Sequence, residues 1–379
     1  NIMFQRAILH FDLDFFFTSI ECRNNDSLRG RPLLIGSMEG RSMVSACNYE
    51  AWRYGIRAGM PMMVALQRCP DATVLRGDIE LYQRESSVIT SIIAEESPLF
   101  EKAALDQFYI DLTGVDRYLG CTQWSKELRA RIHKETGLGL SAGLAVNKLV
   151  AKVGAREAKP SGECFVAQGE ETGFLAPLSV RRLPALGPST QHRLSILGVH
   201  KIAQLREIPP VMLCREFGKP GLSIWRKAWG KDDSPVIPYQ EELSLSREHT
   251  FSEDTIDIDL LEATLGQMVI ALAFELRERQ QVCANVKLKI RYADHNTYRR
   301  QLRLGPTAND QDLRSAARRL LRELFQRRQR IRLIELSLDQ LSHGDRQLGL
   351  FDENPKDTQL QQAMDKIQRR FGEGKIERG

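Results

Sequence analysis

The residues best suited to catalysis in this sequence are two aspartates, each at the border of an apolar run with strand character. Asp12 closes the run 7–11, and Asp106 stands before a second β-rich run, 108–112. If the two strands lie side by side, both carboxylates point into one space. Converging carboxylates suit a pair of hard cations, because Mg²⁺ prefers oxygen ligands and keeps open positions for phosphate. The pattern therefore indicates metal-assisted phosphate chemistry.

Two other interpretations compete with that one. A single aspartate at a strand end is more often a helix cap or a turn residue. The run Asp12-Leu13-Asp14 also resembles a phosphatase motif in which an aspartate becomes phosphorylated. Against the phosphatase, three phenylalanines follow at 15–17, where a phosphate pocket would need small side chains.

Further phosphate ligands can be placed on two later segments. Tyr49 and Arg53 lie one turn apart on a predicted helix, and a hydroxyl with a guanidinium can hold phosphate oxygens. Lys159 follows a strand-to-helix segment at 140–152 and precedes a Pro-Ser-Gly turn. The plainer interpretation is a half-buried tyrosine and two solvated cations.

The elements that position these residues belong to more than one domain. A chain of 379 residues is too long for one core, and its length predicts roughly two to four domains. The periodicity predicts helices at 82–96, 123–136, 261–276 and 310–326, and strands at 31–36, 286–290, 299–303 and 334–338. A polar, proline-bearing stretch at 232–238 separates off the last domain.

The composition is that of an ordinary globular protein, with 42% hydrophobic and 27% charged residues. No apolar run approaches the ~20 residues that a membrane-spanning helix needs, and we see no signal-peptide pattern. Seven cysteines are scattered without a CxxC pair. We therefore expect a reduced, cytoplasmic and nucleoid-associated chain without structural zinc.

Positive charge is concentrated near the C-terminal end. Residues 285–332 hold 14 Lys/Arg against 4 Asp/Glu, an excess larger than the +5 of the whole chain. Alternation predicts one basic strand face made of Lys287, Lys289 and Arg291, and a return strand with Arg299 and Arg303 on one side. Solubility does not require such clustering, whereas binding a phosphate backbone does.

Five motifs in register resemble Y-family translesion DNA polymerases, in particular the DinB, or DNA polymerase IV, branch. They are His10-Phe11-Asp12-Leu13-Asp14, Asn48-Tyr49-Glu50-Ala51, Asp106 with Tyr109-Ile110-Asp111, Ser141-x-Gly143-Leu144-Ala145-x-Asn147-Lys148, and Lys159-Pro160-Ser161-Gly162. The order and spacing hold from about Ile8 to Phe351, which is nearly the whole chain.

This resemblance implies an α+β multidomain fold, a right-hand polymerase with a palm, small fingers, a helical thumb bearing a helix-hairpin-helix, and an α/β little finger. The implied palm is residues 1–30 and 77–165, the fingers 31–76, the thumb 166–235, a linker 236–243, the little finger 244–343 and a tail 344–379. It implies low-fidelity, template-directed DNA synthesis past damaged template.

The resemblance also implies site residues and a cofactor. Asp12 and Asp106 would bridge two Mg²⁺ ions, with Mn²⁺ able to substitute, and the Leu13 carbonyl would complete one metal site. Tyr49 and Lys159 match triphosphate ligands, to which we add Arg53 from its position beside Tyr49. Phe17 matches the steric gate that excludes a ribose 2′-hydroxyl.

The implied partners are primer-template DNA, deoxynucleoside triphosphates and a sliding clamp, bound by a monomer. Four residues near the C-terminus resemble the clamp-binding peptide of bacterial polymerases: Gln347, Leu348, Leu350 and Phe351. An apolar Leu-Phe pair with a nearby glutamine is suited to a pocket with a polar edge.

Three positions depart from the family pattern. Gln107 stands where the family has a glutamate, Trp52 where it has an arginine, and Ala185 where it usually has a glycine. The first two remove charge from the expected metal and nucleotide site. They leave open a second interpretation, a non-catalytic assembly protein that binds DNA and clamp, although such a protein would need none of the matched site residues.

Overall fold

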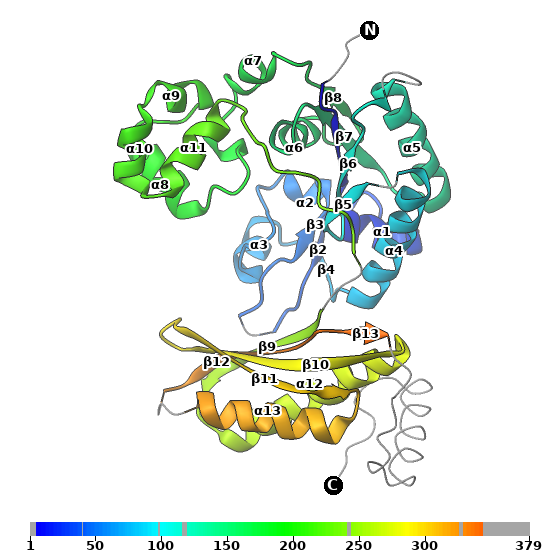
Figure 1. The fold of residues 1–379 in the computed structure, drawn as a ribbon, viewed down its shortest axis with the longest axis vertical. Helices are drawn as coiled ribbons and strands as arrows, with labels where there is room; N and C mark the ends of the chain where they lie inside the picture. Colours follow the sequence, from blue (N-terminus) through cyan, green and yellow to red (C-terminus); the bar gives the residue numbers. More distant parts are fainter. Residues whose placement is uncertain are drawn as a thin grey trace. The chain divides into compact units, whose positions relative to one another are not determined.

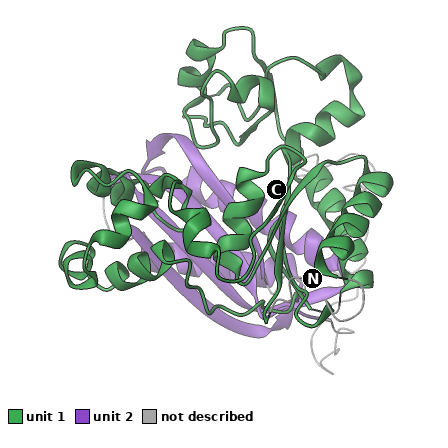
Figure 2. Ribbon diagram, turned by 90° about the horizontal axis from the view of Figure 1, so that it is seen from above, with its two compact units in different colours: residues 1–239 green, residues 240–379 purple. Residues whose placement is uncertain are grey.

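The computed structural model describes residues 5–39, 41–97, 99–115, 120–240, 244–325 and 329–343. The chain divides into two compact units, residues 1–239 and 240–379 (Figure 2). Within the described ranges, no helix combines the length and apolar character needed to cross a membrane. Each unit has its own sheet and its own hydrophobic core, and each is described separately.

The first unit is built on a five-stranded sheet in the order β5-β6-β1-β7-β8. The strands are β1 (Ile8–Leu13), β5 (Phe100–Ala104), β6 (Gln107–Asp111), β7 (Leu140–Ala145) and β8 (Glu163–Phe165). β1 lies in the middle, antiparallel to both β6 and β7, and all its residues are buried. The predicted apolar run is therefore the central strand of the sheet.

Helices cover both faces of this sheet, which explains why β1 is buried on both sides (Figure 1). Leu9, Phe11 and Leu13 pack against α1 (Phe16–Asn24), α4 (Ile79–Glu96) and α5 (Cys121–Thr136). Ile8 faces the opposite side, where it packs with α6 (Lys148–Glu157). α6, which carries Lys148 and Lys152, thus lies across the face of the sheet that also carries Asp12.

Two smaller substructures complete the first unit. Strands β2 (Leu33–Ile35), β3 (Ala46–Cys47) and β4 (Thr73–Leu75) form a separate sheet with α2 (Tyr49–Trp52) and α3 (Met62–Arg68). Short helices follow as α7 (Glu171–Leu175), α8 (Pro188–Ile196), α9 (Ile202–Glu207), α10 (Pro210–Phe217) and α11 (Pro220–Ala228). These two groups coincide with the expected fingers and thumb segments.

The turn before α8 takes a left-handed backbone at a residue that is not glycine. Ala185 has φ 59°, a region that side chains with a Cβ adopt at a cost. A single 3₁₀ turn, Val180–Arg182, precedes this turn in place of a full helix. The helix-hairpin-helix expected in the thumb therefore has a single 3₁₀ turn where its first helix would stand.

The stretch expected as a free linker lies partly along the first unit. Arg6 Nη1 donates to the carbonyl oxygen of Asp232 at 3.3 Å, and the Asp232 carboxylate accepts from the backbone N–H of Leu149 at 3.1 Å. The backbone N–H of Tyr239 donates to the carbonyl oxygen of Phe100 at 2.7 Å. The first unit therefore extends to Tyr239, several residues past the expected thumb boundary at 235.

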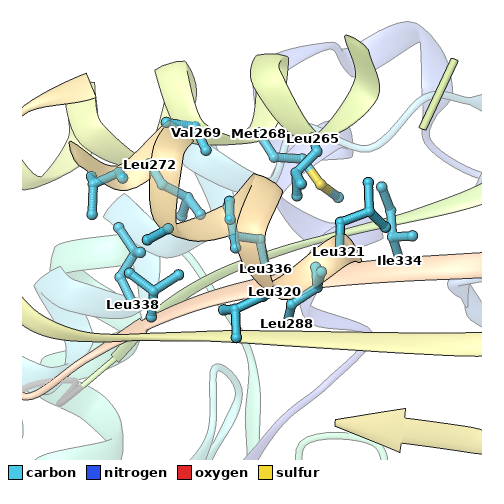
Figure 3. Packing of buried hydrophobic residues seen from close by; sticks show 14 of the residues in the cluster. Leu265, Met268, Val269, Leu272, Leu288, Leu320, Leu321, Ile334, Leu336 and Leu338 are labelled. Atoms are coloured by element: carbon cyan, nitrogen blue, oxygen red, sulfur yellow. The ribbon is translucent and has the colours of Figure 1, made fainter. Parts of the chain in front are cut away.

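The second unit is a four-stranded antiparallel sheet in the order β11-β10-β12-β9. Its elements are β9 (Ser244–Thr255), α12 (Ile258–Glu278), β10 (Gln281–Tyr292), β11 (Thr297–Thr307), α13 (Asp310–Leu324), β12 (Ile331–Asp339) and β13 (Ser342–His343). Both helices pack on one face, where Leu288, Leu336 and Leu338 meet α12 and α13 (Figure 3). Among the described residues of this unit, no helix packs on the other face, which carries polar side chains.

The strands here are longer than the alternation alone predicted, and β9 was not predicted. Its burial pattern has few inward residues, Leu245 and Phe251 among them, which gives no clear alternation to recognise. It is added at the edge by pairing with β12.

Candidate active site

The two predicted aspartates meet at one end of β1. Asp106 occupies the two-residue turn between β5 and β6, and the backbone N–H of Leu13 donates to its carbonyl oxygen at 2.9 Å. In the β1–β6 register Asp12 lies opposite Gln107. The antiparallel pairing therefore joins residues more than ninety positions apart into one site.

Asp12 and Asp106 are both desolvated, and the charge of Asp12 acts on Asp106. Asp12 is only 8% exposed, and burial raises its pKa, while the nearby Lys159 ammonium opposes that rise. Burial also raises the pKa of Asp106, and the charge of Asp12 is the second cause of this increase. A buried pair of like charges favours an added cation at the position between them.

Lys159 supplies positive charge directly at this pair. Its Nζ lies 2.8 Å from Asp12 Oδ1 and 3.7 Å from Asp14 Oδ1. The ammonium is partly exposed, so it can exchange its carboxylate partner for an incoming phosphate. Its position agrees with the role expected from the sequence motif.

Asp14 has a different role from Asp12. Its carboxylate accepts hydrogen bonds from Ser141 Oγ at 2.9 Å and from the backbone N–H of Ser161 at 2.6 Å. These bonds tie the turn after Lys159 to the end of β1. Asp14 therefore holds the lysine-bearing turn in place and does not face Asp106.

Gln107 is bound to a lysine that the sequence motifs did not single out. Lys152 Nζ donates to Gln107 Oε1 at 2.9 Å. Consistent with glutamine at this position, the described residues contain no group of three or more His, Cys, Asp or Glu side chains arranged to hold a metal. That Asp12 and Asp106 are metal ligands stays a prediction.

The phenylalanines after β1 are divided between core and site. Phe16 is buried in the core, whereas Phe17 is half-buried and its ring lies 4.5 Å from that of Tyr82, centroid to centroid. Phe15 has φ 49° and turns its ring edge toward Tyr49 at 6.2 Å. The Phe15 turn thus connects the end of β1 with α2 through the Phe15–Tyr49 contact, and Phe17 packs on Phe16 and Tyr82.

Arg53 lies one turn after Tyr49, as expected, because its backbone N–H donates to the carbonyl oxygen of Tyr49 at 3.1 Å. It caps the C-terminal end of α2 with an exposed side chain, and its role as a phosphate ligand stays a prediction. Tyr49 stacks on Trp52 at 6.1 Å, and the Arg57 guanidinium lies 4.2 Å above the Trp52 ring. Arg57 was missed by the sequence analysis because a tryptophan and a turn separate it from the motif.

On the open face of the second unit, the basic residues fall into two groups. Arg299 lies opposite Lys289 and Arg303 opposite Asn285 in the β10–β11 register, so both arginines share the outer face with Lys287. Lys287 pairs with Asp339 at 2.5 Å. The basic strand face is present, but carboxylates from β12 neutralise part of it.

Lys289 is the most strongly neutralised residue of this face. Its ammonium forms an ion pair with Glu335 and lies 3.3 Å from Glu248. Arg291 donates to Thr297 Oγ1 at 3.3 Å, which leaves its charge uncompensated there. The net positive stripe therefore runs along β10 and β11, and not across the whole face.

Comparison with known proteins agrees with this architecture. Residues 11–156 match the impB/mucB/samB family, and residues 242–350 match the C-terminal domain of the same family. DNA polymerase IV of Dehalococcoides mccartyi is 34% identical over 378 residues, 99% of this chain and 97% of that protein. DNA polymerase IV of Halorhodospira halophila is 36% identical over 349 residues, 91% of this chain and 98% of that protein.

The chain belongs to the DinB-like Y family of DNA polymerases. Solved structures share its fold. A Y-family polymerase chimera gives a TM-score of 0.74 at 24% identity and covers 88% of this chain and 98% of its own. DinB from Sulfolobus solfataricus gives 0.64 at 24% identity, with the same coverage. The expected α+β polymerase fold is confirmed.

As a Y-family polymerase, the chain depends on divalent metal, primer-template DNA and deoxynucleotides in general. The four predicted clamp-binding residues, Gln347, Leu348, Leu350 and Phe351, lie outside the described residues. Of the residues that the sequence analysis missed, Lys152 had a usable signal, because it lies one helical turn after Lys148 in the motif.

Proposed function

We propose that this Y-family polymerase extends primers past damaged template by nucleotidyl transfer with two Mg²⁺ ions, for which Mn²⁺ can substitute. The observation that carries the proposal is the buried Asp12–Asp106 pair with the Lys159 ammonium 2.8 Å from Asp12. Primer extension by the purified chain, on intact and damaged templates, tests it. A chain that binds DNA but extends no primer in either metal would support the non-catalytic alternative.

The donor set fits hard divalent cations. Asp12 and Asp106 are desolvated, and burial raises the pKa of both. A divalent cation would stabilise their charged forms, and Mg²⁺ prefers oxygen donors of this kind. Asp12 and Asp106 would hold the ions, and the Leu13 carbonyl would add a third oxygen. The chemistry that such ions supply is activation of the primer 3′-hydroxyl and neutralisation of the triphosphate.

The remaining site residues position the nucleotide. The Lys159 ammonium and the Tyr49 hydroxyl bind triphosphate oxygens, and Arg53 or Arg57 adds a guanidinium from the same side. The Phe17 ring, held by Tyr82, closes the space that a 2′-hydroxyl would occupy. We assign the palm, fingers, thumb and little finger as expected from the sequence, with the thumb side of the linker held against the palm as far as Tyr239.

We predict that Gln107→Glu raises the single-turnover rate by about tenfold, equivalent to roughly 1.4 kcal/mol of barrier, because it adds a carboxylate at the metal site. Apparent nucleotide affinity should change far less. Trp52→Arg should instead improve nucleotide affinity first, because it adds a cation near the triphosphate. Rapid-quench incorporation in Mg²⁺ and in Mn²⁺ measures both, and an effect of Gln107→Glu on affinity alone would contradict this assignment.

We predict that the edge strand β11 dominates DNA binding by the second unit. Replacing Arg299 and Arg303 by alanine should reduce the slope of log affinity against log salt by about 2, since each phosphate contact contributes about 0.9. The matched control is Arg300→Ala, because Arg300 lies on the same strand but shares the opposite face with Leu288. Fluorescence anisotropy over a salt series provides the slopes.

Replacing the ion-paired Lys287 and Lys289 by alanine together with their partners Asp339 and Glu335 leaves the net charge unchanged and should have a smaller effect than the Arg299/Arg303 change. The open face would lose its assignment as the DNA platform if Arg300→Ala matched the double variant, or if affinity did not depend on salt.

The tail residues Gln347, Leu348, Leu350 and Phe351 are proposed to bind a sliding clamp. Replacing Leu350 and Phe351 by alanine should abolish clamp binding and clamp-stimulated synthesis, because the apolar anchors of such peptides carry most of the affinity. Basal extension on a short primer-template should persist. Surface plasmon resonance with a bacterial clamp tests this, with Leu360→Ala as a tail control, and equal affinity in all variants would refute it.

Monomeric state and cytoplasmic location stay predictions.

A further inference from the structure

The charges of two lysines, Lys152 and Lys159, act on both aspartates, and a third lysine, Lys148, lies one turn before Lys152 on α6. The partners of the three differ. Lys148 Nζ pairs with Glu101 at 2.7 Å, and Lys159 Nζ pairs with Asp12 at 2.8 Å. Lys152 Nζ donates to the neutral amide of Gln107 at 2.9 Å, and within the described ranges we find no carboxylate paired with it. The positive charge of Lys152 is therefore the one of the three that is not neutralised.

The contact between Lys152 and Gln107 has a defined polarity. An ammonium has donors only, so the amide group that it binds must present its oxygen to the lysine. The Gln107 NH₂ group then points away from Lys152. While this bond exists, Lys152 occupies one of the two acceptor sites of the Gln107 oxygen, which makes that oxygen a poorer ligand for a cation beside Asp106.

Lys152 also acts on both aspartates through its charge. Burial raises the pKa of Asp12 and of Asp106, and the positive charge of Lys152 opposes the rise at each. A charge close enough to favour both carboxylates repels a cation held between them. Lys152 comes from α6, which lies across the same face of the sheet as Asp12.

We propose that Lys152 sets how tightly this chain binds the divalent cation nearest Asp106, by occupying one acceptor site of the Gln107 oxygen and by leaving an unneutralised charge beside the cation. Lys152 is thus a positioning residue for Gln107 and an electrostatic determinant of metal affinity. This inference rests on the proposed two-metal function and adds to it a residue outside the ligand set. The alternative is a purely structural role, in which the bond from Lys152 to Gln107 only links α6 to β6.

Metal binding without DNA or nucleotide separates these possibilities. Mn²⁺ titration followed by electron paramagnetic resonance gives the affinity of the full-length chain directly. Lys152→Met should bind Mn²⁺ about tenfold more tightly, because one positive charge is removed near the cation. Lys152→Arg keeps both the charge and the donors, so its affinity should equal that of the unmodified chain.

A second substitution tests the part played by Gln107. In a Gln107→Leu background the gain from Lys152→Met should shrink, because only the charge effect remains there and no amide oxygen is released. An equal gain in both backgrounds would overturn the positioning role. Lys148→Met combined with Glu101→Gln removes the neighbouring ion pair as a unit and should leave Mn²⁺ affinity unchanged.

The outcomes also distinguish this inference from the function beneath it. If Lys152→Met is unchanged or weaker in Mn²⁺ binding while Asp106→Asn abolishes binding, only the role of Lys152 is refuted. If the unmodified chain binds no Mn²⁺ and extends no primer, the proposed function itself fails. If Lys152→Met does not fold, as judged by thermal unfolding, Lys152→Gln takes its place, with the same tighter binding expected.

Discussion

Replacing Asp106 by asparagine is expected to reduce single-turnover nucleotide incorporation by about 10³-fold or more, equivalent to roughly 4 kcal/mol of barrier. Asp106 is one of the two carboxylates that we propose as metal ligands at the junction of β1 and β6, and its neighbour at the third position is the neutral Gln107. A site with only two proposed carboxylate ligands cannot lose one negative charge and still bind a cation tightly. Losing one charge removes most of its capacity to hold a cation where the reaction develops charge.

Rapid-quench incorporation measures this effect, and two controls make it specific. Asp111→Asn removes a carboxylate from the other end of the same strand, where Asp111 accepts a hydrogen bond from the backbone N–H of Thr113, and should leave the rate nearly unchanged. DNA affinity should stay as in the unmodified chain. A rate for Asp106→Asn within threefold of the unmodified chain would remove Asp106 from the catalytic role.

Phe17→Ala should allow ribonucleotides to be incorporated while leaving deoxynucleotide incorporation largely intact. We expect the preference for deoxynucleotides, expressed as the ratio of kcat/KM values, to fall by about 10²-fold or more. The physical reason is steric, because the Phe17 ring is fixed between Phe16 and Tyr82 and cannot move aside for an extra hydroxyl.

Paired single-nucleotide incorporation with a ribonucleotide and the matching deoxynucleotide measures the ratio. Phe17→Tyr keeps the ring and should retain the exclusion. Phe16→Ala removes a core side chain and should lower the thermal stability of the chain without changing the sugar preference. If Phe17→Ala excluded ribonucleotides as well as the unmodified chain does, another residue would have to be the gate.

The sequence by itself determined the central strand, both aspartates and the lysine-bearing helix, because each follows from a local pattern. A run that is mostly apolar and does not alternate predicted a buried strand, and every residue of β1 is buried. The alternation likewise put Lys287 and Lys289 on one face of their strand and Arg299 and Arg303 on one side of the next, and the β10–β11 register brings the two together. Local periodicity was sufficient in these cases.

Only the tertiary structure decided which charges are free to act. Asp12 and Asp14 are equivalent in the sequence, yet Ser141 and Ser161 bind Asp14 and leave Asp12 to Lys159. These contacts join residues more than a hundred positions apart, and no local pattern specifies them.

Contacts between residues far apart in the sequence also explain the two largest differences between the sequence predictions and the structure. The basic face of the second unit is neutralised in part because Glu335 lies opposite Lys289, which depends on the β10–β12 register. Lys152 reaches Gln107 because α6 packs on β7 and on β1, the strand that pairs with β6. The sequence determined which residue types the polymerase places at its site, whereas long-range pairing of strands and helices decided which of their charges remain uncompensated.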